Sequence, residues 1–169
     1  MPEPQRSSVL GYFERRFGIP VTAFVGYHLL ERRTTYVLLP ASPCLASLAS
    51  LKVHHVGLPL LRKIRQHLKP TTAALQRFGA QATCNVLDLS AAQVTDLLRT
   101  AELALEVDLS PGYVVLRHAG RLLGCGLYTP GRLRSQIPLR LVQHQRLPET
   151  PEAVRPSPCR CGRDPLSFF

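Results

Sequence analysis

The stretch GYVVLRHAGRLLGCGLYTPGRLRSQIP, residues 112–138, contains three short runs of alternating residues that are separated by two turn signals. Ala119-Gly120 and Pro130-Gly131 are turn dipeptides, and the runs beside them are rich in β-branched and aliphatic residues. The spacing therefore predicts three consecutive antiparallel strands, over residues 113–118, 121–128 and 132–137.

Alternation along the second of these strands sorts its side chains onto two faces. Leu123, Cys125 and Leu127 fall on one face, and Gly124 and Gly126 fall on the other. Because glycine weakens the interior of a strand, two glycines on one face indicate either a bend that closes a small barrel or the close approach of a ligand chain.

The third strand carries Arg132, Arg134 and Gln136 on one face. Same-face residues of a strand lie about 7 Å apart, a spacing that suits two guanidinium groups binding successive phosphates. A solvated outer face is the alternative explanation for two exposed arginines. We expect the glycine face and the arginine face to form one outward wall that receives phosphates.

Charge along the chain supports a polyanionic partner. The 169 residues carry a formal net charge of +10, and all but three of the 21 Lys and Arg residues are arginine, which fits phosphate oxygens bidentately. No acidic residue occurs between Glu31 and Asp88 or from Gly112 to Arg146, although both stretches contain basic residues. Such sorting is typical of a polarised surface, with a basic surface kept for solubility as the alternative.

The residues before this stretch predict further helices and strands. A helix capped by Ser7 or Ser8 is followed by two strands around Arg33 and by a short turn or helix at 42–48. A strand-like run at 53–64 that bends at Pro59 precedes a short helix capped by Thr71 or Thr72. A strand at 84–89 then leads into an amphipathic helix that opens with a capping box at Ser90 and Gln93.

Three motifs of residues 112–138 occur together: Gly-Tyr-Val-Val at 112–115, Leu-Gly-Cys-Gly at 123–126, and a basic strand that reaches Ile-Pro at 137–138. In this order they resemble a PUA domain of the kind attached to sun-family ribosomal-RNA cytosine-5 methyltransferases and found in Nip-class ribosome-biogenesis factors. Residues 85–103 resemble the opening strand and helix of that domain, although Thr100-Ala101-Glu102 lacks its glycine. Residues 17–32 and 56–79 resemble the segment that precedes the PUA domain in those proteins.

The resemblance implies a small β pseudo-barrel that binds structured RNA. We expect an α+β fold with an N-terminal pre-PUA α/β module over residues 1–81, a PUA-like domain over 82–146 and a Pro-rich flexible tail over 147–169. The expected function is non-catalytic binding of ribosomal or transfer RNA in ribosome biogenesis or RNA modification. The alternatives are a protein-interaction adaptor and the targeting subunit of a separate RNA cytosine-5 methyltransferase, so a methyltransferase or a pre-ribosomal particle is a further expected partner.

We expect RNA to contact the basic residues of the two acid-free stretches and the two strand glycines. The candidate residues are Arg62, Lys63, Arg65, Lys69, Arg117, Arg121, Gly124, Gly126, Arg132, Arg134 and Arg140.

Catalytic, cofactor and metal sites are not expected. No glycine-rich turn joins a strand to a helix in the way that a cofactor site requires, and Cys44, Cys84 and Cys159 lack the sequence context of the sun-family catalytic cysteine. The neighbours His54 and His55 would point to opposite faces of a strand. The Cys159-Arg160-Cys161 pair supplies two of the four ligands that a structural zinc needs.

The cysteines and the hydropathy predict a location in the cytoplasm. Five cysteines, an odd number, with no secretory signal predict free thiols in a reducing compartment. Cys125, between two glycines, is expected to be a buried structural cysteine, with a reactive thiol as the alternative. No apolar run approaches the roughly 18 residues of a membrane span, so no membrane partner is expected.

Overall fold

The computed structural model describes residues 3–43 and 56–138. The elements of its first part are α1 (Glu3–Phe17), the 3₁₀ helix η1 (Val21–Phe24), β1 (Tyr27–Arg32), β2 (Thr35–Pro40), β3 (Leu58–Ile64), β4 (His67–Pro70), α3 (Thr72–Phe78) and the 3₁₀ helix η2 (Gly79–Gln81). The elements of its second part are β5 (Val86–Asp88), α4 (Ala91–Thr100), β6 (Glu102–Ala104), β7 (Gly112–His118), β8 (Arg121–Thr129) and β9 (Arg132–Ser135).

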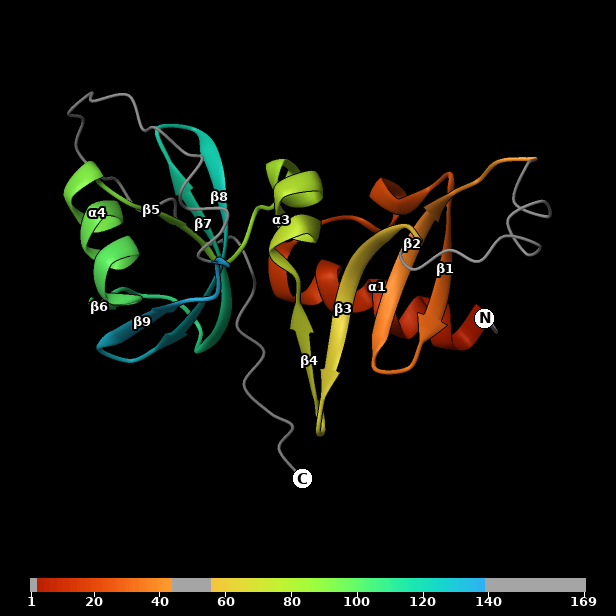
Figure 1. The fold of residues 1–169 in the computed structure, drawn as a ribbon, viewed down its shortest axis with the longest axis horizontal. Helices are drawn as coiled ribbons and strands as arrows, with labels where there is room; N and C mark the ends of the chain where they lie inside the picture. Colours follow the sequence, from red (N-terminus) through yellow and green to blue (C-terminus); the bar gives the residue numbers. More distant parts are fainter. Residues whose placement is uncertain (1–2, 44–55, 139–169) are drawn as a thin grey trace.

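The strands form two sheets, one in each part (Figure 1). The first has the order β1-β2-β3-β4 and is antiparallel throughout. The second has the order β5-β7-β8-β9-β6 and is antiparallel except for the parallel pair of β5 and β7. Helices together with two sheets confirm the expected α+β class, and the three strands predicted from residues 112–138 are β7, β8 and β9.

Helix α1 supplies the largest side chains of the first core. Phe13 and Phe17 are fully buried, and the ring of Phe13 lies 5.4 Å from that of Phe24 in η1, measured between centroids. Val9, Leu10, Phe13 and Phe17 are the buried apolar residues of the helix. The helix begins at Glu3, before the two serines that were expected to cap it, and the positive end of a helix dipole favours an acidic residue in the first turn.

Strands β3 and β4 form a hairpin where the sequence predicted a single strand. Arg65 and Gln66 make its turn, and Arg65 adopts a φ of 54°. Because a turn of this kind is normally marked by Gly, Asn or Asp, the sequence carried no signal for it. Pro59 lies in β3 beside a register shift of β2, between Tyr36 and Val37, which provides the irregularity that a proline in a central strand needs.

Helix α3 lies between the two sheets (Figure 1). Of the two threonines expected to cap it, Thr71 does so: its hydroxyl accepts a hydrogen bond of 3.1 Å from the backbone N–H of Ala74. The side chain of Gln76 donates to the carbonyl of Leu123 on β8 at 3.1 Å. The helix therefore ties the second sheet to the first.

The predicted capping box of α4 is present. The Ser90 hydroxyl accepts from the N–H of Gln93 at 3.2 Å, and the Gln93 side chain accepts from the N–H of Ser90 at 2.9 Å. Ala101 ends the helix with a φ of 60°, at the place where the PUA-like pattern lacks its glycine. The short strand β6, which the sequence did not predict, follows at once and pairs with β9.

Two hydrophobic cores share β7 and β8. Val115 and Cys125 pack with α1, α3 and the first sheet, whereas Leu116 and Leu123 pack with α4. Leu123 is an extra residue of β8, since Leu116 pairs with Gly124 and the next residue of β7 pairs with Leu122. Strand β8 is thus covered on both faces. The division of the chain between residues 81 and 82 stays a prediction.

The cysteines only partly follow the expectation of free thiols. Cys125 is free and buried, but Cys84 is disulfide-bonded, so the expectation is wrong at that position. The cytoplasmic location, which rested on free thiols, stays a prediction. Within residues 3–43 and 56–138, no helix is long and apolar enough to cross a membrane.

Candidate nucleic-acid interface

Arg132 and Arg134 lie side by side on β9 and share the carboxylate of Glu102 on β6. Arg132 Nε donates to one Glu102 oxygen at 2.9 Å, and Arg134 Nε donates to the other at 2.9 Å. These hydrogen bonds, first that from Arg132 and then that from Arg134, hold the pKa of Glu102 below its usual value. No acidic residue lies near these arginines in the sequence, but the fold brings Glu102 into contact with both of them. Their side chains remain 55% and 52% exposed, which leaves guanidinium surface open to solvent.

Gly124 and Gly126 do not form an outward wall, and that prediction is wrong. Both are buried, because β8 is covered on both faces. A Cβ atom on Gly124 would lie 2.5 Å from Cγ2 of Thr72, and one on Gly126 would lie 3.0 Å from the side chains of Leu116 and Leu133. The glycines are needed for close packing within the protein, next to the register shift at Leu123.

Arg117 and Arg121 lie away from the β9 arginines. Arg117 donates twice to the carboxylate of Asp88 on β5, at 2.6 Å each time, and this hydrogen bonding raises its pKa. Arg121 is exposed at the turn between β7 and β8, at the opposite end of β8 from Arg132. Along the strand, that separation is about 26 Å. A role of these two residues in binding RNA stays a prediction.

The β3–β4 hairpin divides its basic residues between two faces. Arg62 and Lys69 are cross-strand partners and so lie on one face. Lys63 lies on the other face, where it donates to Glu31 and its Nζ atom sits 4.8 Å from the centroid of the Tyr36 ring. The hydrogen bond to Glu31 raises the pKa of Lys63. The predicted cluster is therefore not a single patch.

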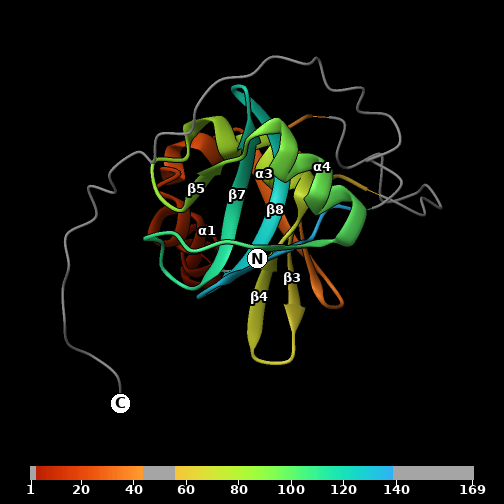
Figure 2. The same ribbon diagram turned by 90° about the vertical axis from the view of Figure 1, so that its left-hand side faces the viewer.

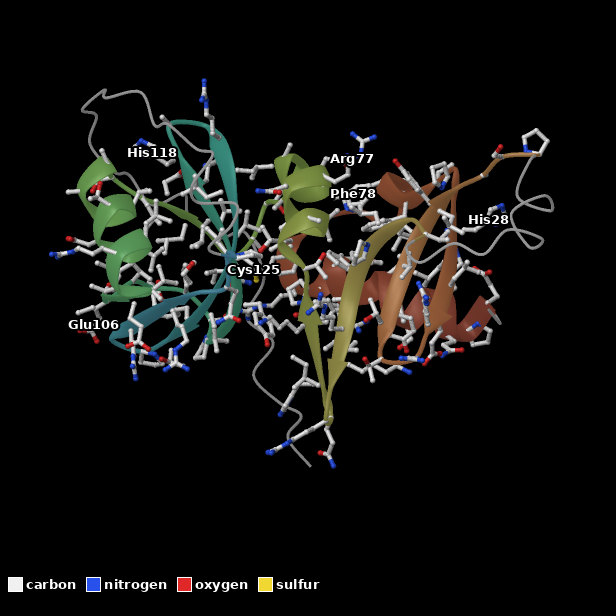
Figure 3. The ribbon with its side chains drawn as sticks, in the orientation of Figure 1. His28, Arg77, Phe78, Glu106, His118 and Cys125 are labelled. Atoms are coloured by element: carbon white, nitrogen blue, oxygen red, sulfur yellow. The ribbon has the colours of Figure 1, made fainter. Side chains whose placement is uncertain are left out.

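One contact joins the hairpin to β9. Lys69 Nζ donates to the side-chain oxygen of Gln136, which follows Arg134 in the chain. Lys69 and Arg62 of the hairpin thus lie close to the end of β9, and the four cations Arg132, Arg134, Lys69 and Arg62 are here called the basic band; Glu102 pairs with the first two. Figure 3 shows side chains of β9 and of the hairpin along one side of the molecule, and Arg77 on the opposite side. The hairpin extends beyond the rest of the described chain in both views (Figures 1 and 2).

The sequence anticipated part of this arrangement. Alternation placed Gln136 on the face of the two β9 arginines; β9 ends at Ser135, so that placement stays a prediction, and the structure adds the contact of Gln136 with Lys69. Glu102 was missed as their partner, because it belongs to a strand that the sequence did not predict and lies 30 residues before Arg132. The hairpin that brings Arg62 next to Lys69 was missed for lack of a turn signal.

Cys125 is the buried structural cysteine that the sequence favoured. It is fully buried between the two sheets (Figure 3), and burial raises the pKa of its thiol to about 12. A thiol of this kind stays protonated at neutral pH and is a poor nucleophile.

For the remaining candidate residues, the structure does not test a role in binding RNA. Arg65 is exposed in the hairpin turn. The following residues named from the sequence lie outside the described part of the chain: Cys44, His54, His55, Arg140, Cys159 and Cys161.

The comparisons with known proteins bear on the second part of the chain. Residues 84–143 match the family model described as the methyltransferase RsmF PUA domain. This segment contains the whole second sheet, from β5 to β9, and the arginines of β9. No curated protein matches the chain. The match confirms the resemblance seen in the sequence: residues 84–143 are similar to the PUA domain of the RsmF methyltransferase, and a PUA domain is an RNA-binding module.

Proposed function

We propose that this protein is a non-catalytic RNA-binding protein that holds structured RNA, ribosomal or transfer, through its PUA domain and the basic band. The observation that carries the proposal is the junction of the two parts: Lys69 meets Gln136, so that cations of the hairpin continue the row of β9 arginines. A phosphate backbone can follow such a row, because its sequence-independent contacts need spaced cations rather than a closed pocket.

The electrostatics of the band favour RNA over small anions. From Arg132 to Gln136 the chain spans about 13 Å, long enough for more than one phosphate of an extended strand. Glu102 neutralises part of the charge of Arg132 and Arg134 and hydrogen-bonds to both guanidinium groups. Arginine keeps donors free even when one edge of its fork is occupied, so Arg132 and Arg134 retain capacity for phosphate oxygens.

The test is a fluorescence anisotropy titration of a labelled hairpin RNA at several salt concentrations. If each cation of the band contacts one phosphate, the logarithm of the affinity should fall with the logarithm of salt with a slope of about −3.6. Between 50 and 200 mM salt the affinity should then fall by roughly two orders of magnitude. Absence of binding by the intact protein at 50 mM salt would overturn the proposal.

Replacing arginines of the basic band by neutral residues tests whether RNA binds there. Arg132→Gln with Arg134→Gln should reduce the salt slope to about −1.8 while the protein stays folded. Glutamine is preferable to glutamate here, because reversed charges would crowd against Glu102. The matched control is Arg77→Gln, which removes an exposed arginine on the opposite side of the molecule (Figure 3) and should leave the slope unchanged. If the intact protein, the double variant and Arg77→Gln all gave the same salt slope, the β9 arginines would not belong to the RNA interface.

A targeting subunit of a separate RNA cytosine-5 methyltransferase is a second candidate. It is favoured by the matching family model, which is that of a methyltransferase's PUA domain and covers residues 84–143. Large apolar side chains are exposed in the first part, among them Val25 at 75% and Ile64 at 45%, and these suit a protein partner. Calorimetry with S-adenosylmethionine should give no heat of binding with this chain alone, since the proposal assigns catalysis to the partner.

A further inference from the structure

A groove opens where the hairpin, α3 and the end of β9 meet. Its volume is about 280 Å³, at the lower limit of ligand pockets, and so suits a group of the size of one nucleotide. Its lining consists of two cations, three prolines, two threonines and an alanine: Arg62, Lys69, Pro59, Pro70, Pro138, Thr71, Thr72 and Ala73.

The polar groups of the groove point to an anionic ligand. Arg62 is exposed and makes no hydrogen bond or ion pair within the described residues, and Lys69 donates a hydrogen bond to the neutral side chain of Gln136. Among the residues that the structure describes, no carboxylate lines the groove. The threonine hydroxyls are already engaged, Thr71 with the carbonyl of Pro59 and Thr72 with that of Gln136. Incoming phosphates would therefore be bound by the two cations.

The walls of the groove are apolar and rigid. Pro59, Pro70 and Pro138 line the groove, and the ring of each proline fixes its φ angle, so that little entropy is lost when a ligand packs on them. In a duplex the faces of the bases are stacked on one another, and only an unpaired nucleotide can offer its base face to such a surface.

We propose that this groove holds one unpaired nucleotide of the bound RNA, with its two flanking phosphates at Arg62 and Lys69 and its base or ribose against the prolines. The inference rests on the proposed function and makes it specific: the RNA is structured, but a single-stranded segment adjoins its helix. The RNA site then includes residues of both parts of the chain, Arg62 and Lys69 from the first part and the β9 arginines from the PUA domain.

Two labelled RNAs test the proposal, a blunt-ended duplex and the same duplex with a short single-stranded extension. The intact protein should bind the extended RNA several-fold more tightly, because only its unpaired nucleotide can pack its base against the prolines. Arg62→Gln with Lys69→Gln should reduce this preference to about twofold or less and lower the salt slope by about 2. Arg77→Gln is the matched control and should keep the preference.

A second variant fills the groove without changing its charge. Ala73→Phe places a ring in the groove from α3 and should abolish the preference for the extended RNA while leaving the affinity for the blunt-ended duplex and the salt slope unaltered. Thermal unfolding checks that each variant is folded. Equal affinity of the intact protein for both RNAs, or a preference that persists in both variants, would show that the groove does not hold an unpaired nucleotide. Neither result would contradict the proposed function. No binding of either RNA would overturn both.

Discussion

Replacing Gly124 by alanine should destabilise the fold without weakening the binding of RNA by the folded protein. Gly124 has a φ of +144°, a conformation that side-chain-bearing residues rarely adopt, and it is buried where β8 meets α3. An added Cβ would lie 2.5 Å from Cγ2 of Thr72 and 3.3 Å from Cγ1 of Ile137. Either the backbone or α3 must therefore shift.

The magnitude follows from two costs. Forcing a residue with a side chain into a rarely populated backbone region costs about 1–3 kcal/mol. Adding a methyl group to a packed site costs a further 1–3 kcal/mol, roughly, so the unfolding free energy should fall by about 2–6 kcal/mol. For a chain of this size, the middle of that range corresponds to a fall in Tm of about 8–16 °C.

The assay is denaturant unfolding of a four-member set: the intact protein, Gly124→Ala, Thr72→Ser and the double variant. Thr72→Ser removes Cγ2 but keeps the hydroxyl that donates to Gln136, so the double variant should recover the steric part of the loss and retain the backbone part. Gly126→Ala is the control, because Gly126 lacks a positive φ and its Cβ would meet only the ends of leucine side chains at 3.0 Å. It should lose less stability than Gly124→Ala.

The refuting result is a Gly124→Ala protein with unchanged stability and reduced RNA affinity. That outcome would mean that the glycine faces the ligand, as the sequence suggested, and that the packing described for β8 is wrong.

Two further perturbations probe the charges and the buried thiol. Glu102→Gln should raise RNA affinity several-fold at low salt and steepen the salt dependence, because Arg132 and Arg134 then lack the carboxylate they share; the anisotropy titration measures it, and an unchanged affinity would place the β9 arginines outside the interface. Since the pKa of Glu102 is held below its ordinary value near 4.3, its contribution to stability is present above that value and is lost only as the pH falls through the lower, folded value. The difference between Glu102→Gln and the intact protein should thus stay constant from about pH 5 to 7. Cys125, whose pKa burial raises to about 12, should resist iodoacetamide at pH 8 in the native protein and react once urea unfolds it; mass spectrometry of the modified peptide reports this, and rapid native alkylation would show that the site opens.

The sequence predicted the elements whose signals are local. Turn dipeptides at Ala119-Gly120 and Pro130-Gly131 delimit β7, β8 and β9, and the capping box at Ser90 starts α4. These signals act over a few residues, through backbone conformation and side-chain hydrogen bonds, so they do not depend on what the element later packs against.

The predictions that failed depended on partners far away in the chain. Alternation correctly separated Gly124 from Cys125 on β8, but whether a face is solvent or core is decided by what covers it. Here α3 covers Gly124, and Cys125 is buried in the first core. Likewise, Glu102 reaches Arg132 only because β6 pairs with β9.

By itself, the sequence determined most of the strand and helix pattern, the PUA-like order of motifs and a strongly basic character, because each depends only on neighbouring residues or on composition. Only the tertiary structure decided which cations act together. Arg62 meets Lys69 through a turn without a turn signature, and Lys69 meets Gln136 across two sheets. Such contacts form because two cores are buried against one shared pair of strands. The free energy of that burial comes from residues far apart in the sequence, so no short stretch of sequence predicts it.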